Sequence, residues 1–596
     1  MAEHNLQLDD GSHVAVMGSG PAGSFFSYFL LDMAERVGMD IQVDVYEPRD
    51  FSRPGPPGCN MCAGIVSESL VQTLAAEGIN LPPTVIQRGI DAYMLHTDVG
   101  SVGIETPLHE KRIGAVYRGP GPRGIKEIKW GSFDGHLQSL AVDKGANVIH
   151  ERVTEVSWNN DGRPQIKARG GSPQTYDLLA VAVGVNTAAL KLFQGLELGY
   201  QPPRTTRTFI REYYLGQETV GRVLGNSVQV FLLHIPRLEF GMFIPKGDYV
   251  TMCLLGQEID KELVQSFLDT PEVKQCFPPD LRLDQGACQC SPRATIQGAV
   301  QPFADRIVFL GDCGVTRYYK DGIGAAYRAA KSAATTAIFQ GVSAADFRRH
   351  YGPVCRAIES DNTIGKVIFA VVRQIQKRRF ARRAVLRMVS SEQQKEGGQR
   401  RMSMVMWDMY TGSASYRDIF LRTLHPAFWL RFGWDILASL LPATPNAQDE
   451  SGRPGEELPM DSGALGKVYQ PGDILIRQGE VGECMFVIQE GQVALMQEHG
   501  GEEVFLGVRS AGEILGEMAI FEKEVQMATV RALSQVRVLT VDKKNFLGRI
   551  HEDPSLAYRL FQLMSRRIRE LSQQVTLLNK ELDRLTEGDM DVRRNA

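Results

Sequence analysis

The sequence lacks the features of a secreted, membrane-spanning or disulfide-stapled protein. It has no uninterrupted apolar run of the roughly 18 residues that a spanning helix needs. Residues 1–11 are polar and acidic, unlike an export signal, which is charged and then apolar. Only 9 of the 596 residues are cysteine, so we expect mostly free thiols. We therefore expect a cytoplasmic protein.

The sequence also lacks an excess of charge of one sign. There are 66 Lys and Arg against 70 Asp and Glu, a net charge of -4, which excludes a chain that is basic or acidic throughout. The 43% hydrophobic content excludes global disorder, and the length suffices for three or four domains. Glycine is abundant: 59 of the 596 residues, about a tenth, against a typical share of about 7%. We therefore expect many tight turns or close backbone approaches.

A dinucleotide-binding pattern stands near the N-terminus. A β-type run over 13–17 leads into Gly18-Ser19-Gly20-Pro21-Ala22-Gly23 and then a helix-like segment over 24–37. Here Gly18 allows the turn, Gly20 lets the backbone approach a pyrophosphate, and Gly23 permits close packing of helix on strand. The phosphates would lie at the positive end of the helix dipole. A second strand, 41–46, ends in Glu47, whose carboxylate can accept both ribose hydroxyls.

Three later segments resemble the FAD-dependent oxidoreductases related to aromatic hydroxylases. A strand over 305–310 ends in Gly311-Asp312, which puts a carboxylate where it can hold the ribityl chain. The sequence Gly322-Ile323-Gly324 opens a small-residue helix through 337, whose N–H groups can face the N1/O2 edge of reduced flavin. Residues 176–187 resemble the returning strand and glycine turn of that superfamily.

Within that superfamily the chain resembles the geranylgeranyl reductase group. Four segments carry the resemblance in the family's order: Gly58-Cys59-Asn60-Met61-Cys62-Ala63-Gly64-Ile65-Val66-Ser67; Phe133-Asp134-Gly135-His136-Leu137 with Lys144-Gly145-Ala146; Phe240-Gly241-Met242-Phe243-Ile244-Pro245-Lys246-Gly247-Asp248; and Gly311-Asp312. The sequence departs from the family at an aromatic pair, here Phe240 and Met242, and at an arginine, here Trp130 beside Lys129.

The resemblance implies an enzyme that delivers hydride from flavin to an isoprenoid double bond at a membrane. It places Gly322 and Gly324 at the isoalloxazine, and Phe240, Met242, Phe243 and Pro245 at the substrate. Cys62 would be a proton donor or orienting group near the flavin, or else a small packed residue. No second GxGxxG follows, so NAD(P)H or a ferredoxin is left open as electron donor. The alternatives are a flavin monooxygenase and a scaffold without turnover; a halogenase's Trp-x-Trp-x-Ile-Pro is not found.

Two pairs of closely spaced cysteines suit other chemistry. Cys59-x-x-Cys62 has the spacing of a redox dithiol or of half a metal site, and Cys288-x-Cys290 could supply the other half. The two spacings are unlike, and no His partner stands nearby, so we predict no metal site.

The balanced total charge hides a basic stretch. Residues 361–445 contain 14 basic and 6 acidic residues, and 363–391 contain eight basic residues and no acidic one, interleaved with apolar residues. Residues 427–441 are rich in Trp, Phe and Leu, with Arg431, Asp435 and Ser439 on one stripe. A helical cap on the flavin domain and monotopic contact of 363–441 with the inner face of a membrane are both consistent with this pattern. A basic run alone cannot recognise a nucleic-acid sequence, so we expect no nucleic-acid partner.

After a Pro- and Gly-rich linker, 446–463, short β runs are separated by glycine turns, as in an antiparallel roll. From Pro471-Gly472-Asp473 to Ala528-Thr529 the order of motifs resembles the cyclic nucleotide-binding domain family. The resemblance places Gly516, Glu517, Met518, Ala519, Gln526, Ala528 and Thr529 in a nucleotide pocket. Gln526 stands where the family has a phosphate-binding arginine, so we expect weak or absent cyclic AMP binding.

The last long segment, 560–585, has leucines and related residues at helical spacing, so we expect a homodimer, with packing on its own domain as the alternative. The predicted fold is an α/β FAD-binding Rossmann-type domain with an inserted α+β substrate domain, a basic helical segment, and a cyclic-nucleotide-binding β-roll with flanking helices. The predicted boundaries are 1–360 (substrate part 85–130 and 190–295), 361–445, 446–463, 464–580 and a polar tail, 581–596.

Overall fold

The chain divides into two compact units, one of residues 1–71 with 81–465 and one of residues 72–80 with 466–596. The computed structural model describes residues 6–106, 110–125, 127–279, 281–282, 286, 288–394, 400–440, 464–482, 484–518, 525–552 and 555–594. The predicted linker, 446–463, and Ala519 lie outside these residues.

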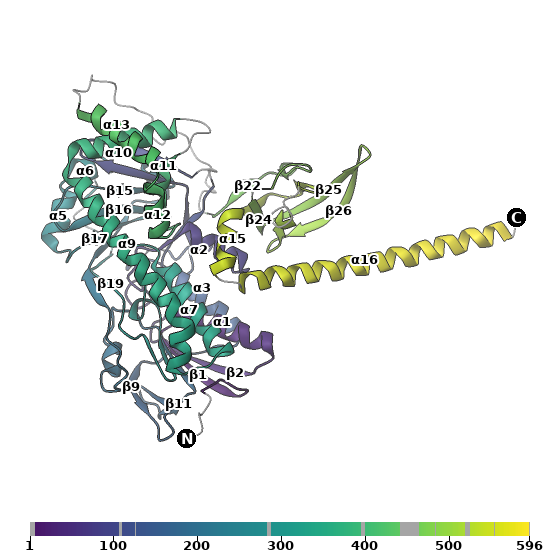
Figure 1. The fold of residues 1–596 in the computed structure, drawn as a ribbon, viewed down its shortest axis with the longest axis horizontal. Helices are drawn as coiled ribbons and strands as arrows, with labels where there is room; N and C mark the ends of the chain where they lie inside the picture. The colour runs from purple at the N-terminus through teal and green to yellow at the C-terminus, as the bar shows by residue number, and fades with distance from the viewer. Residues whose placement is uncertain are drawn as a thin grey trace. The chain divides into compact units, whose positions relative to one another are not determined.

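The first unit contains a six-stranded sheet, in the order β20-β21-β12-β1-β2-β8. Its strands β1 and β2 are labelled near the N-terminus in Figure 1. Its strand β1 pairs in parallel with β2 on one side and β12 on the other. Residues Val14 to Met17 are buried on both faces, as expected for a parallel strand covered by helices. The strands are β1 (Ser12–Met17), β2 (Ile41–Tyr46), β8 (Asn147–Ile149), β12 (Leu178–Val181), β20 (Phe303–Ala304) and β21 (Ile307–Phe309).

Helices α1 (Pro21–Val37), α3 (Phe133–Asp143) and α7 (Gly322–Phe339) accompany this sheet, and α1 packs against both of the others. Helix α7 approaches α1 closely because its contact face is built from fully buried alanines such as Ala330 and Ala334. The sheet is parallel except for the edge strand β20, and together with its helices it confirms the Rossmann-type prediction.

The first unit also contains a seven-stranded sheet, in the order β18-β14-β17-β16-β15-β5-β6. Strand β16 (Leu238–Lys246) shows its alternation: Phe240, Met242 and Ile244 belong to one core cluster, and Phe243 belongs to the cluster on the other side. The other strands are β5 (Ala92–Thr97), β6 (Gly100–Glu105), β14 (Phe209–Tyr214), β15 (Ser227–Phe231), β17 (Tyr249–Gly256) and β18 (Cys288–Cys290).

Smaller elements complete the α+β part. Three short sheets are present, β3-β7-β4, β11-β10-β9 and β13-β19. Their strands are β3 (Ile65–Val66), β4 (Ile86–Ile90), β7 (Ile113–Val116), β9 (Val153–Trp158), β10 (Pro164–Ala168), β11 (Gln174–Thr175), β13 (Arg204–Arg207) and β19 (Arg293–Gln297). The helices are α2 (Glu68–Ala76), α4 (Gln217–Leu224), α5 (Lys261–Leu268), α6 (Pro271–Lys274) and α8 (Ala344–Asp346), with short η1 (Ala189–Phe193), η2 (Gly311–Cys313) and η3 (Phe347–Tyr351).

The basic segment is helical. Its elements are α9 (Gly352–Lys377), α10 (Arg379–Gln393), α11 (Arg401–Thr411), α12 (Tyr416–Thr423) and α13 (Pro426–Leu440). They share the core cluster of Phe240 and Met242, through residues such as Phe369, Tyr410 and Phe432. No helix among the described residues is both long and apolar enough to cross a membrane.

The second unit contains a β-roll made of two four-stranded sheets, β22-β29-β24-β27 and β23-β28-β25-β26. Two helices follow it, so the predicted β-roll with flanking helices is confirmed. Its elements are β22 (Lys467–Tyr469), β23 (Ile474–Ile476), β24 (Cys484–Glu490), β25 (Gln492–His499), β26 (Glu502–Ser510), β27 (Ile514–Leu515), β28 (Thr529–Ala532), β29 (Val536–Asp542), α15 (Lys543–Glu552) and α16 (Ser555–Arg594).

Candidate cofactor and substrate cavity

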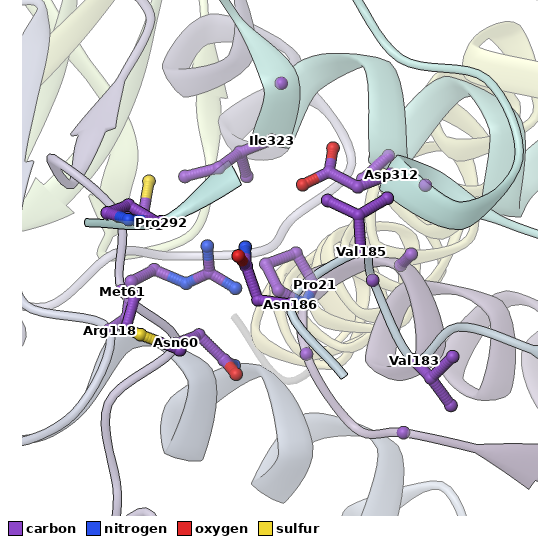
Figure 2. A pocket seen from close by; sticks show the side chains of 18 of the residues that line it. Pro21, Asn60, Met61, Arg118, Val183, Val185, Asn186, Pro292, Asp312 and Ile323 are labelled. Atoms are coloured by element: carbon purple, nitrogen blue, oxygen red, sulfur yellow. The ribbon is translucent and has the colours of Figure 1, made fainter. Parts of the chain in front are cut away.

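A cavity of about 1050 Å³ in the first unit brings together most of the residues predicted to bind a dinucleotide. The glycine loop before α1, the end of β2, the segment after β21 and the start of α7 all border it. In Figure 2 the side chains of Asp312 and Ile323 border the space that Arg118 enters from the opposite side.

The glycine loop has the geometry that a bound pyrophosphate requires. Gly18 has φ +93°, and a Cβ there would lie 2.7 Å from the carbonyl oxygen of Ala182. A Cβ on Gly23 would collide with the carbonyl oxygen of Gly18. Helix α1 begins at Pro21, with Gly20 as its N-cap and no side chain capping it. Its first N–H groups are thus available to an anion, and Gly18, Gly20, Pro21 and Ala22 line the cavity.

Glu47 is held rigidly at the end of β2. Its two carboxylate oxygens accept hydrogen bonds from the backbone N–H groups of Ser19, at 2.8 Å, and Arg49, at 2.9 Å. Burial raises the pKa of Glu47, and these two hydrogen bonds oppose that shift. Each oxygen keeps a second lone pair, so ribose hydroxyls can donate to the same carboxylate.

A buried guanidinium that we did not predict enters the cavity. Arg118 forms an ion pair with Asp134, which is fully buried at the start of α3. Asn60 donates a hydrogen bond to the same carboxylate. Burial disfavours the charged guanidinium, but Asp134 outweighs it and raises the pKa of Arg118. The sequence signal was the Phe-Asp-Gly motif, whose aspartate is paired with an arginine 16 residues earlier rather than with one at position 130.

Asp312 and the start of α7 form the third wall. Gly311 has φ +62° and lies against Ala22, which brings this segment to the start of α1. The Asp312 side chain is exposed to the cavity, and the surrounding protein raises its pKa by desolvation. Gly322 and Ile323 line the cavity at the first turn of α7, whereas Gly324 lies one residue further along the helix.

The four predicted substrate residues divide between the two faces of β16. Met242 lines the cavity, and the buried ring of Phe240 lies beside it in the same cluster. Phe243 instead packs on Phe267 and Phe277, away from the cavity, because successive residues of a strand face opposite sides. Pro245 has the parity of Phe243 and is not among the lining residues.

Two unpredicted side chains stand beside Met242. Lys320, in the segment before α7, and Tyr410, at the end of α11, both line the cavity. Lys320 opens the segment that holds the Gly322-Ile323-Gly324 motif, but the motif assigned no role to the lysine. Tyr410, 90 residues further on, belongs to no sequence pattern that marks a site.

Cys62 lines the cavity together with Ala63 and Gly64. Cys59, Cys62, Cys288 and Cys290 are free thiols. Among the residues the structure describes, no group of three or more His, Cys, Asp or Glu is arranged to hold a metal.

In the second unit, the carboxylate of Glu517 is already engaged. Arg567 of α16 forms an ion pair with Glu517 and donates to the carbonyl oxygen of Ile514. The backbone of Gln526 bonds to Gly479 and Glu480, which places its side chain beside Gly516. The side chains of Met518 and Ala528 are at least partly exposed, and the hydroxyl of Thr529 accepts from the backbone of Gln478.

Residues 466–553 match the family model of the cyclic nucleotide-binding domain. The chain carries such a domain. A 116-residue stretch is 29% identical to the cyclic AMP receptor protein of Thermus thermophilus, covering 19% of this chain and 54% of that protein. A 109-residue stretch is 33% identical to the cAMP-activated global transcriptional regulator CRP of Salmonella typhimurium, covering 18% and 52%. The chain thus spans about half the length of these relatives.

The likenesses of the whole chain to flavin-type solved structures are distant. A flavoprotein/dehydrogenase from Cytophaga hutchinsonii is 13% identical, covers 72% of this chain and all of that chain, and has a TM-score of 0.49. The halogenase PltM is 11% identical, covers 72% of this chain and 91% of its own, and has a TM-score of 0.46.

Proposed function

We propose that this chain is an FAD-dependent oxidoreductase that reduces carbon–carbon double bonds of an isoprenoid or other lipid at a membrane surface. The observation that carries FAD binding is the cavity itself. One space collects the glycine loop of α1, the carboxylate of Glu47, the Asp312 carboxylate and the start of α7. These groups suit, in turn, a pyrophosphate, a ribose, a ribityl chain and the electronegative edge of a flavin ring.

FAD, when bound, supplies the hydride chemistry. The chain's own residues hold and orient it. The first turn of α1 receives the phosphates, Glu47 accepts from the ribose, and Asp312 accepts from the ribityl hydroxyls. Gly322 and Ile323 present backbone N–H groups at the positive end of α7. The electron donor, NAD(P)H or a ferredoxin, binds transiently in this proposal.

The other end of the cavity supports an apolar substrate. Ile210, Met242 and Leu255 line it, together with Cys253 and Tyr410. Such walls favour a hydrocarbon chain because burying apolar surface is worth about 25 cal/mol per Å². Cys62 stands where it could donate a proton or orient the bound group.

Helix α13 supports membrane contact because it buries polar residues and exposes large apolar ones. Its buried residues include Asp435 and Ser439, and Arg431 bonds to Asp435, so the polar stripe faces the protein. Phe428 and Phe432 are buried beside that stripe, whereas the other large apolar side chains face outward: Trp429, Leu430, Trp434, Leu437 and Leu440 are all more than half exposed, with Leu430 at 77%. Tryptophans on an outward apolar face are typical of a helix lying in a membrane interface.

Cations flank this face. Arg383 and Arg387 are exposed on α10, which packs on α13, and Arg387 donates to the carbonyl oxygen of Ala438. The two helices thus present an apolar strip beside positive charge, which suits anionic lipid.

Flotation with vesicles tests the membrane proposal. Leu430→Asp with Leu437→Asp should lower the affinity for vesicles containing anionic lipid at least tenfold, since each carboxylate must enter the interface. The matched control is Val142→Asp, an exposed apolar residue on α3. If the α13 variant and the Val142→Asp control lose vesicle affinity equally, or if the wild type does not bind vesicles, membrane docking through α13 is contradicted.

Anaerobic mixing of the reduced flavoprotein with prenyl lipids tests the reaction. Reoxidation of the flavin by the lipid, with a saturated product detected by mass spectrometry, is the expected result. Reoxidation only by oxygen in the presence of an aromatic substrate would favour the monooxygenase alternative and overturn the reductase.

We also propose that the C-terminal domain serves regulation or assembly of a homodimer, with weak or absent cyclic nucleotide binding. The Glu517 carboxylate is held by Arg567, and Gln526 offers no charge to a phosphate. Both features oppose tight binding.

A further inference from the structure

Lys320 is a buried cation at the substrate end of the cavity. It stands between Tyr319, with φ +60°, and Asp321, with φ +55°, so two non-glycine residues in the left-handed region hold it in place before α7. Its ammonium nitrogen lies 4.5 Å from the ring centroid of Phe240, 5.7 Å from that of Tyr410 and 4.0 Å from the sulfur of Met242.

No counter-ion for this cation is found in the part of the chain that the structure describes. Among the residues that the structure describes, no carboxylate forms an ion pair with Lys320. The adjacent carboxylate of Asp321 accepts a hydrogen bond from Ser67 at 2.7 Å and pairs with Arg317 and Arg328 at 3.5 and 3.3 Å. Aromatic faces compensate a buried ammonium only in part. Because a buried charge is costly unless paired, a lysine that lines a cavity and has no ion-pair partner among the described residues points to an anionic group supplied by a ligand.

The surrounding walls limit what else that ligand carries. The cavity around Lys320 is lined by Ile210, Met242, Cys253 and Leu255, which offer an apolar surface. A ligand that fits both the walls and the cation has an apolar body and one negatively charged oxygen.

We propose that Lys320 binds an oxyanion carried by an apolar substrate, a carboxylate, enolate or phenolate on a hydrocarbon or aromatic body. The inference rests on the proposed function in taking this end of the cavity as the substrate site. It deepens that function by distinguishing an acidic lipid from a neutral one. Lys320 is then a binding and specificity residue.

Among the titratable groups around Lys320, the lysine itself is the one that we expect to change charge near neutral pH. Burial lowers the pKa of Lys320 to about 8. Burial raises the pKa of the Cys253 thiol to about 12 and raises that of the Tyr410 phenol, so both stay neutral. Asp321 is engaged with its arginines. Binding of the acid should therefore weaken as the pH rises from 7 to 9.

The test compares two ligands that share one hydrocarbon chain. The oxidised flavoprotein is titrated with geranylgeranoic acid and with geranylgeraniol, and the flavin absorbance band reports binding without turnover. We expect the acid to bind at least tenfold more tightly at pH 7 and to lose most of that advantage at pH 9. Phenylacetate and 2-phenylethanol form a second, shorter pair that should show the same preference.

Variants separate charge from structure. Lys320→Met should abolish the preference for the acid while the alcohol binds as before, and Lys320→Arg should retain the preference. The matched control is Lys331→Met. Lys331 is a buried lysine of α7 that lies over the ring of Phe29 of α1 and does not line the cavity. It should keep the full preference.

Absence of an acid preference in both wild-type pairs overturns the inference, as does a loss in Lys320→Met that is equal for acid and alcohol. Acid-selective binding without any reduction of the lipid would leave the Lys320 site standing and overturn the reductase instead.

Discussion

At the scale of single residues, Lys320 should cost the protein stability. The folded chain lowers the pKa of Lys320 from 10.5 to about 8 by burial, so its ammonium is less favourable there than in the unfolded chain. Replacing Lys320 with Met should raise the free energy of unfolding at pH 7 by up to about 3 kcal/mol, at roughly 1.4 kcal/mol per pKa unit.

The stability gain of Lys320→Met should depend on pH. Between about pH 8 and 10.5 the unfolded wild type binds more protons than the folded form, so its stability rises with pH and the advantage of Lys320→Met shrinks. Urea unfolding at pH 7 and 9.5 measures this. All five tryptophans of the chain lie in the first unit, so their fluorescence reports that unit. An advantage of the same size at both pH values would contradict burial of the charge.

Asp134 should be needed for both stability and cofactor binding. Asp134→Asn leaves the buried Arg118 without its counter-charge, which typically costs about 3–5 kcal/mol. We expect FAD to be lost on desalting and the urea midpoint to fall. The control is Asp161→Asn, at an exposed turn between β9 and β10, which should change neither. Arg118 lines the cavity, so retention of FAD by Asp134→Asn would mean that the Arg118–Asp134 pair is not needed to hold the cofactor.

At the scale of elements, local patterns predicted what local physics determines. The turn at Gly18, the strand over 41–46 and the helix that follows the glycine loop all depend on neighbours in the sequence, and the structure has them. The position of Lys320 beside Tyr410 depends on the segment before α7 meeting the end of α11, 90 residues further along the chain, and no spacing in the sequence encodes that.

Helix α13 shows a second limit. Its sequence places Arg431, Asp435 and Ser439 on one stripe, and an ordinary surface helix would turn that stripe to solvent. The structure buries Asp435 and Ser439, and the partly exposed Arg431 bonds to Asp435 and to Ser391 of α10. The pattern fixed the two faces of the helix, whereas its polar partners on α10 decided which face is outside.

The β-roll allows a test of the missing phosphate ligand. Gln526→Arg introduces a charge-assisted hydrogen bond, roughly twice as strong as a neutral one, so cyclic AMP should bind at least tenfold more tightly in calorimetry of the full chain. Gln492→Arg, on an exposed strand of the same roll, controls for added charge. Tight binding by the wild type that persists in Gln526→Ala would contradict this account of the pocket.

At the scale of the whole molecule, α16 leaves an apolar stripe that a second copy would cover. Met564, Ile568, Leu571, Val575 and Leu578 are between 43% and 64% exposed. Their spacing alternates between four and three residues, which is the a/d pattern of a two-stranded coiled coil. One helix cannot bury such a stripe against itself, so the repeat supports the proposed homodimer.

Light scattering after size exclusion tests the dimer. The wild type should elute at twice the monomer mass, and Leu571→Glu should shift it to the monomer because a carboxylate at a d position must be buried between the helices. Gln573→Glu adds the same charge two residues away, on the side opposite the stripe, and should leave the dimer intact. A monomeric wild type, or a Leu571→Glu protein that stays dimeric, would mean that α16 is not the dimer contact. FAD binding should be unchanged in both variants, because every residue that lines the cavity belongs to the first unit.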